Sequence, residues 1–206
     1  MAETGRTDTY HHGDLRQALL NNCLKLIEEK GVSGFTLREV ARISGVSPAA
    51  PYHHFKSKTE LLAAVALMGF EMLDEAQRKA SEKCDNPVDR LRALGRSYVL
   101  FAVNHKVYFH VMFRANPEPL WENDLVMNAA KQALTHLENT IRELNPEVKE
   151  ANDSHFQKTI LSCWSMAHGL ASLWVDGPLR VTESGKLDIE ELVDLVFGHS
   201  MIPRKF

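Results

Sequence analysis

Apolar residues recur at helical spacing through most of the chain. Within residues 13–30, Leu15, Leu19 and Cys23 lie on one helical face, and Gly31 follows where a left-handed residue most easily ends a helix. The alternation of apolar and polar residues between turn clusters that marks strands does not occur in the sequence. The pattern therefore predicts an all-α protein.

Thr36 begins a second, shorter helix. Thr36 and Glu39 have the spacing of a capping box, in which the hydroxyl accepts the Glu39 backbone N–H and the carboxylate reaches back to the N-cap. Gly45 is placed to end this helix in a tight turn.

Two more helix starts follow at once. Ser47 is a good N-cap, and Pro48 suits the first position of a short helix that runs to about residue 55. Ser57 and Glu60 form another capping-box pair and begin a long third helix. Two short helices around a tight turn, packed against a preceding helix, are typical of a helix-turn-helix, which places its second helix in the major groove of DNA.

The rest of the chain is also predicted to be helical, which makes about nine helices in all. Pro117 and Pro119 mark one break, and Asp176-Gly177-Pro178 separates the last two helices. The predicted helices cover about residues 58–80, 86–104, 108–112, a segment that ends at 144, 153–175 and 188–201.

Residues 45–62, GVSPAAPYHHFKSKTELL, resemble the signature of the TetR family of bacterial transcription regulators. The family pattern has Gly-Val-Ser, three variable residues, usually Leu or Ile, then Tyr, any residue, His-Phe, two residues, Lys, one residue, and Glu-Leu-Leu. This chain has each of these except the Leu or Ile. The resemblance covers the first third of the chain. It implies a DNA-binding domain over residues 1–58, with the helix-turn-helix at about 36–55, and a helical ligand-binding and dimerisation domain over 59–206.

The resemblance also implies roles for individual residues. Phosphate contacts set the register on DNA and supply salt-dependent affinity, whereas groove-facing side chains carry sequence information. The positions that correspond to phosphate contacts are Thr36, Tyr52, His54 and Lys58. The positions that correspond to the groove-facing part of the second helix are Ser47, Pro48, Ala49, Ala50 and His53.

Pro51 departs from the family pattern, which usually has Leu or Ile there. Its missing N–H removes the first helical hydrogen bond, so we expect the second helix to start with a distorted turn. With Ala49 and Ala50 beside it, the segment offers methyl contacts to thymine but few bidentate hydrogen bonds. We therefore expect DNA shape to contribute more than usual to recognition.

A second resemblance lies near the C-terminus. Trp164, His168 and Gly169 look like the regulatory-domain pattern of a TetR branch named for its Trp-His-Gly. In the family, the last two helices of each subunit pair into a four-helix dimer interface. The candidate contacts here are Leu161, Leu173, Leu192, Leu195, Val196 and Phe197. These residues could instead complete the core of a monomer, but a dimer is favoured because one short recognition helix rarely gives tight specific binding.

Aromatic and methionine residues gather between residues 98 and 121 and again near 164. At helical spacing such residues more often complete a core than line a pocket, but the middle helices of the family usually surround an apolar effector cavity. The predicted effector is hydrophobic or amphipathic. The predicted cavity residues are Tyr98, Phe101, His105, Phe109, Met112, Phe113, Trp121, Asn128, Trp164 and His168.

Composition adds limits rather than a function. The 206 residues carry a formal charge of −3. Residues 1–60 hold eight Lys/Arg and seven Asp/Glu, so DNA binding must depend on placed groups rather than bulk charge. Three widely spaced Cys indicate a reducing cytoplasm rather than a disulfide framework. No signal peptide or membrane-length apolar run is seen, so we expect no membrane partner.

Enzyme chemistry is not indicated. The sequence has no nucleophile elbow, phosphate-binding glycine loop or metal-ligand motif, and His105 and His110 have poor spacing for a shared metal. No cofactor or metal is therefore expected. The favoured interpretation is a homodimeric repressor, released from a pseudo-palindromic DNA operator by a small effector. An enzyme and an architectural DNA-binding protein without an effector are the alternatives.

Overall fold

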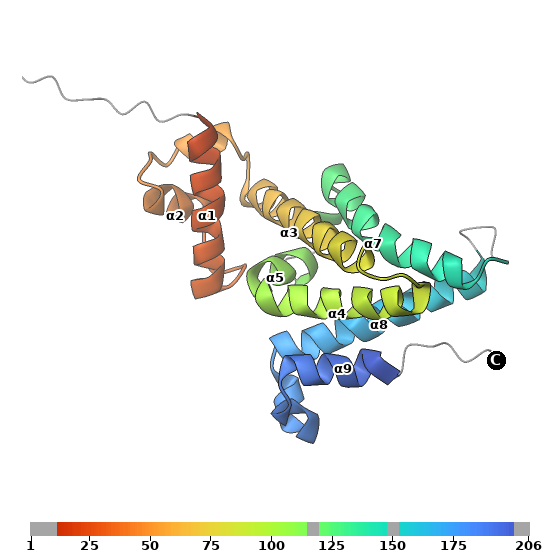
Figure 1. The fold of residues 1–206 in the computed structure, drawn as a ribbon. Helices are drawn as coiled ribbons and strands as arrows, with labels where there is room; N and C mark the ends of the chain where they lie inside the picture. The colour runs from red at the N-terminus through yellow and green to blue at the C-terminus, as the bar shows by residue number, and fades with distance from the viewer. Residues whose placement is uncertain (1–11, 115–119, 148–152, 200–206) are drawn as a thin grey trace, which may run out of the picture.

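The computed structural model describes residues 12–114, 120–147 and 153–199, and its regular secondary structure in these ranges is entirely helical (Figure 1). The all-α prediction is therefore confirmed. A small N-terminal lobe contains α1 (His12–Lys30), α2 (Leu37–Ile43) and a short 3-10 helix, η1 (Ala50–His53). The body contains α3 (Lys58–Ser81), α4 (Pro87–Asn104), α5 (Lys106–Arg114), α7 (Asp124–Leu144), α8 (Ser154–Val175) and α9 (Ile189–His199). Two 3-10 helices, η2 (Pro178–Val181) and η3 (Glu183–Lys186), join α8 to α9.

The helix ends follow the local signals. Thr36 accepts the Glu39 N–H at 3.2 Å, and the Glu39 carboxylate accepts the Thr36 N–H at 2.9 Å, which completes the predicted capping box. Ser57 caps α3 by accepting the Glu60 N–H at 3.2 Å. Gly45 has a φ of +69°, which L side chains rarely adopt and which turns the chain sharply after α2. The predicted breaks at residues 117 and 119 lie outside the described residues.

The second helix of the helix-turn-helix differs from the prediction. Residues 47–49 form a turn, and only Ala50–His53 are helical, as a 3-10 helix. The N–H groups of Ala50 and Tyr52 donate to carbonyls three residues back, at 3.0 and 3.1 Å. Pro51 lacks the N–H that would donate to the Ser47 carbonyl in an α-helix, so the tighter 3-10 pattern replaces it. The distortion expected from Pro51 is present, and it extends through the whole segment.

The body is built around α3, which packs against α4, α5 and α7. Two glycines allow close helix contacts there. A Cβ at Gly69 would lie 2.6 Å from Met112 Sδ, so α3 and α5 approach closely at this point. A Cβ at Gly95 would lie 2.6 Å from Phe197 Cε1, so the Phe197 ring of α9 packs directly onto the α4 backbone. The position of α9 therefore depends on the absence of a side chain at Gly95.

No helix in the described ranges combines the length and the apolar character needed to cross a bilayer.

Candidate nucleic-acid interface and internal cavity

The turn between α2 and α3 is held by two inward-facing residues. Pro51 is buried, and Phe55 is 2% exposed with the Arg16 guanidinium 5.3 Å from its ring centroid. Because these two side chains point inward, the intervening Tyr52 and His53 point outward and are exposed. The sequence thus presents a small, outward-facing surface on a fixed backbone.

Most of the predicted DNA-contacting positions lie on this outward surface. Exposed side chains are those of Thr36, Ser47, Pro48, Ala49, Tyr52 and His53, and partly buried ones are those of Ala50, His54 and Lys58. They come from the first turn of α2, from the turn and η1, and from the first turn of α3. The segment that was predicted to contact DNA is therefore largely exposed, although its backbone is not an α-helix.

Lys58 occupies an unexpected position. Its Nζ donates to the Phe35 carbonyl at 2.7 Å and lies 4.0 Å from the centroid of the Phe35 ring. Partial burial lowers the pKa of Lys58, while nearby Cys23 and Glu39 oppose that shift. The ammonium group thus links the first turn of α3 to Phe35, the residue that precedes the N-cap of α2. Two of its three N–H donors remain for other partners.

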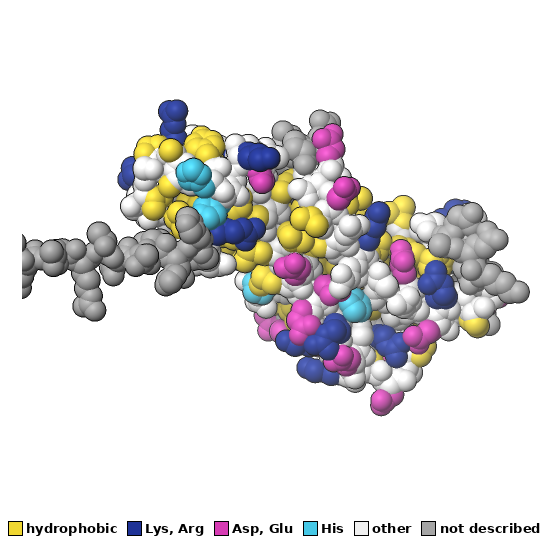
Figure 2. Space-filling model, turned by 90° about the horizontal axis from the view of Figure 1, so that it is seen from above, with side chains coloured by type: hydrophobic (Ala, Val, Ile, Leu, Met, Phe, Trp, Pro, Cys, Tyr) yellow, Lys and Arg dark blue, Asp and Glu magenta, His cyan; other side chains and the backbone are white. Residues whose placement is uncertain are grey.

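Individual charged side chains occupy defined positions on the N-terminal lobe. In Figure 2, Lys, Arg and His side chains are prominent on the viewed face of the N-terminal lobe, whereas acidic and basic side chains are interspersed on the body. Glu39, the acidic member of the capping box, is paired with Lys30 at 2.8 Å. The hydrogen bond from Lys30, with that from the Thr36 N–H, lowers the pKa of Glu39. The Glu39 carboxylate therefore stays ionised, and Lys30 is its ion-pair partner.

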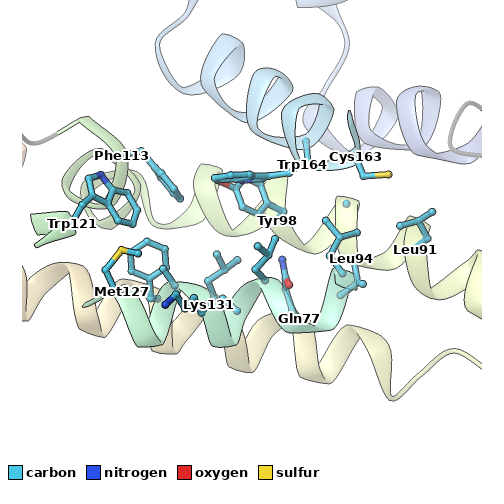
Figure 3. Close-up of a pocket in the computed structure, with 18 residues that line it drawn as sticks. Gln77, Leu91, Leu94, Tyr98, Phe113, Trp121, Met127, Lys131, Cys163 and Trp164 are labelled. Atoms are coloured by element: carbon cyan, nitrogen blue, oxygen red, sulfur yellow. The ribbon is translucent and has the colours of Figure 1, made fainter. Parts of the chain in front are cut away.

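A cavity of about 220 Å³ lies inside the body (Figure 3). Its walls come from α3, α4, α7 and α8, with Phe113 and Trp121 at one end. The lining is mostly apolar. The lining residues are Phe70, Leu73, Gln77, Leu91, Leu94, Gly95, Tyr98, Phe113, Trp121, Met127, Ala130, Lys131, Ala133, Leu134, Leu137, Cys163, Trp164 and Ala167.

Four of the predicted cavity residues lie in this wall: Tyr98, Phe113, Trp121 and Trp164. Five of the others lie elsewhere. Phe101 and His105 line a separate surface groove between α3 and α4. Phe109 and Met112 are buried in the core, and Asn128 is exposed on α7.

His168, the tenth predicted residue, does not line the cavity but contacts two residues that do, Tyr98 and Phe113. Its Nδ1 lies 2.8 Å from the Tyr98 hydroxyl, and its ring centroid lies 4.8 Å from that of Phe113. Burial lowers the pKa of His168, and the positive charge of Arg114 adds to the shift while Asp176 opposes it. A neutral His168 can accept a hydrogen bond from the Tyr98 hydroxyl, and this bond fixes the orientation of the Tyr98 ring in the cavity wall.

Sequence reasoning missed two polar residues of the lining, Gln77 and Lys131. Gln77 follows Phe70 and Leu73 at helical spacing on α3, so it is a polar residue on an apolar stripe. That interruption was the available signal. Lys131 gives no such signal, because a lysine on a helix is usually a solvated surface residue.

No cluster of three or more metal-ligating side chains occurs among the described residues. His110 Nε2 lies 3.5 Å from Asp176 Oδ1, and Arg114 pairs with the same carboxylate. These contacts tie α5 to the end of α8.

Comparisons with known proteins identify the lobe and the body separately. Residues 19–65 match the bacterial regulatory proteins of the tetR family, and residues 91–198 match the tetracyclin repressor-like C-terminal domain. The chain belongs to the TetR family. It is a transcriptional regulator with a DNA-binding helix-turn-helix, and it is not an enzyme.

Individual relatives agree with this assignment. The chain is 39% identical over 83 residues to the HTH-type transcriptional regulator BetI of Rhizobium meliloti (strain 1021). The matched segment spans 39% of this chain and 40% of BetI. A protein of unknown function from Rhodococcus sp. RHA1 has a TM-score of 0.76 at 29% identity and covers 93% of this chain and 96% of its own. AibR in complex with isovaleryl coenzyme A and operator DNA has a TM-score of 0.68 at 20% identity, over 92% of this chain and 100% of AibR, which shows a shared fold alone.

The predicted dimer contacts of this TetR-family chain divide into two groups. Leu161, Leu173 and Leu195 are 59%, 45% and 55% exposed. Leu192 and Phe197 are instead buried against the rest of their own chain, and Val196 is partly buried. The monomer core accounts for the buried residues, so only the exposed ones leave apolar surface for a second copy.

The His168 environment predicts a pH effect on stability. Its folded pKa lies below the ordinary value of 6.5, so below that pH the unfolded chain binds more protons than the folded chain. The stabilisation is complete above pH 6.5 and decreases as the pH falls from there toward the folded pKa. We expect His168→Gln to lose less unfolding free energy than wild type between pH 7.5 and 5.5, measured by urea denaturation. His155→Gln, at an exposed position of the same helix, should behave as wild type, and equal losses in all three proteins would contradict the prediction.

Proposed function

We propose that this protein is a homodimeric repressor, released from a pseudo-palindromic operator when a small hydrophobic or amphipathic compound binds in the cavity. The observation that carries the proposal is that α3 contributes both to the outward-facing lobe and to the cavity wall. Lys58 lies in its first turn, beside the presented surface, and Phe70, Leu73 and Gln77 line the cavity further along the same helix.

The DNA side of the proposal assigns phosphate contacts to Thr36, Tyr52, His54 and Lys58. Base-edge contacts come from the turn and η1, where the side chains of Ser47, Pro48, Ala49, Ala50 and His53 are small or single-donor. Two such units, one helical turn of DNA apart, would read the two halves of an operator. Such an operator lies in the cytoplasm, which is where we place the protein.

The contribution of Lys58 to phosphate binding can be separated from its contact with Phe35. Lys58→Gln removes the charge but keeps a donor for the Phe35 carbonyl. We expect operator affinity to fall about equally for all sequences, and the slope of log affinity against log salt to decrease by about 0.9. Fluorescence anisotropy over a salt series measures both.

Lys79→Gln is the matched control, because Lys79 lies near the other end of α3 and pairs with Glu75. Its salt slope should equal that of wild type. An unchanged slope in Lys58→Gln, together with a lower melting temperature, would assign Lys58 a structural role only.

The effector side of the proposal rests on the packing of α3. A compound that fills the cavity separates or reorients the helices around it, and Gly69 and Met112 are too close for α3 to move independently of α5. Lys58 then carries a tilt of α3 to the start of α2 through the Phe35 carbonyl. Effector and operator would thereby favour different populations of the same two states. AibR, which shares the fold, has been seen in complex with isovaleryl coenzyme A and operator DNA.

The coupling is tested by reciprocal titration. A true effector weakens operator binding by some factor, and operator must weaken effector binding by the same factor. We expect a factor between about 5 and 150, the usual range for allosteric coupling. Unequal factors, or operator binding that is insensitive to a compound bound in the cavity, would refute the proposed mechanism.

The dimer is proposed to form through the outer faces of α8 and α9. On α8, the small residues Ser162, Ser165 and Gly169 follow at helical spacing, and a Cβ at Gly169 would have open space. The exposed Leu161 and Leu173 flank this row. Small residues between larger apolar ones permit close approach of two helices, and the exposed leucines supply apolar area to bury.

A charge on this surface should therefore prevent dimerisation. We expect the double substitution Leu161→Glu and Leu195→Glu to give a monomer in sedimentation velocity at micromolar concentration, with unchanged helical circular dichroism. Val181→Glu is the control, since Val181 is 88% exposed but lies in η2. A double variant that stays dimeric would move the interface elsewhere.

A further inference from the structure

Gln77 is a buried polar side chain on α3. It is 6% exposed, and its Oε1 has no hydrogen-bond partner among the described residues. In Figure 3 the side chain extends from α3 into the cavity, in the space between Lys131 and Leu94. Leaving a buried amide unpaired costs free energy that an apolar residue of similar shape would not. The position therefore favours a ligand that supplies the missing hydrogen bond.

The other polar groups in the lining are occupied or uncharged. The Tyr98 hydroxyl is bonded to His168. Burial raises the pKa of the Cys163 thiol, which keeps it protonated. No Asp or Glu occurs in the described lining.

Lys131 is the charged side chain in the described cavity lining, and its charge is positive. It is an exposed residue whose side chain nevertheless contributes to the wall, on the α7 side. Among the described residues Lys131 forms no ion pair, and Asp74 of α3 instead bonds to two other residues of α7, Gln132 at 3.1 Å and His136 at 2.8 Å. A negatively charged group on a ligand would thus meet one positive charge that has no ion-pair partner among the described residues, and no carboxylate in the described lining.

We infer that the effector is an amphipathic monoanion, with an acidic group at the Lys131 edge and an interior hydroxyl or N–H that donates a hydrogen bond to Gln77 Oε1. The inference rests on the proposed function, because it names the chemical class that the cavity takes. At about 30 Å³ per water-sized group, 220 Å³ accommodates an apolar body of roughly seven such groups. The apolar lining binds that body, and the two polar side chains select among bodies of equal size.

Gln77 also gives the ligand a direct contact with the helix that reaches the DNA-binding lobe. It lies on α3, nineteen positions after Lys58, a helical distance of about 28 Å at 1.5 Å per residue. The geometry of a hydrogen bond between the ligand and Gln77 depends on the position of α3. The binding free energy of the ligand therefore differs between positions of α3. Such a difference is what a ligand needs in order to shift the equilibrium between two states.

The charge preference is tested with three probes of one chain length: octanoate, 1-octanol and octylamine. Binding to the full-length protein is followed by calorimetry and by the fluorescence of Trp121 and Trp164, both in the cavity wall. We expect octylamine to bind most weakly, and the ratio of octanoate to octanol affinity to fall at least threefold in Lys131→Met. Methionine keeps an unbranched apolar stem without the charge.

Lys83→Met, at an exposed lysine outside the cavity lining, should keep the wild-type ratio. An unchanged ratio in Lys131→Met, or an amine that binds as well as the acid, would overturn the assignment of an anionic group. Failure of all three probes to bind would also overturn it.

The role of Gln77 is tested with octanoates that carry a single hydroxyl at successive carbons. We expect at least one isomer to bind wild type about tenfold more tightly than octanoate, and this gain to disappear in Gln77→Leu. Because leucine removes the unpaired amide, the ligand-free variant should melt about 2–4 °C higher than wild type. A gain that survives in Gln77→Leu, or a ligand-free variant that melts lower, would overturn the assignment.

These results are separable from the proposed function. Operator binding of the ligand-free protein, measured by anisotropy with selected DNA, tests the regulator itself. Tight operator binding together with failed probe discrimination would overturn the monoanionic class and leave the repressor intact. Specific probe binding without any operator binding would overturn the proposed repressor and leave the monoanionic ligand class intact.

Discussion

The structure depends on the continuity of α3, one helix of 24 residues that packs in the lobe at its first turns and in the body along the rest. Ser57 caps its start, and the Lys58 ammonium holds that start to the Phe35 carbonyl. Close contact between Gly69 and Met112 then determines how α3 sits on α5. Because a helix of this length is stiff, a change at one of these contacts changes the geometry at the others.

The same packing leaves the protein with features that cost stability. Side chains that line the cavity lack packing partners on one side, which forfeits part of their dispersion energy. The unpaired Gln77 amide adds about 1–3 kcal/mol. A well-packed apolar core would avoid both costs, and this is the reason we propose the cavity as a binding site. A ligand that binds the folded chain at the cavity would stabilise it in proportion to its affinity and concentration.

The DNA-facing segment shows how one residue changes a familiar motif. Pro51 is buried and serves as an inward anchor, but it cannot donate the hydrogen bond on which an α-helix would depend. The side chains that face outward before it, Ser47, Pro48 and Ala49, are short. Because this turn offers few hydrogen-bond donors, our prediction is that DNA recognition depends mainly on phosphate positions and groove shape.

Local interactions let the sequence by itself determine most of the fold. The capping pair of Thr36 and Glu39, the left-handed Gly45 and the breaks around Gly177 depend on residues within one turn of each other, so the helix ends could be predicted closely. The TetR-like signature likewise identified the presented segment. The 3-10 geometry followed from Pro51, although its full extent did not, because turn and helix compete within a fraction of a kcal/mol per residue.

Tertiary packing alone decided which faces of the helices meet. Aromatic residues at helical spacing satisfy a core and a cavity equally well, so Phe109 and Met112 could not be told apart from Phe113 and Trp121 before the helices were placed. Phe197 is buried because Gly95, about a hundred residues earlier, leaves room for its ring. Gln77 and Lys131 became candidates for the site only when α3 and α7 brought them to one cavity. Such relations join residues distant in the chain, and no local pattern encodes the distance between them.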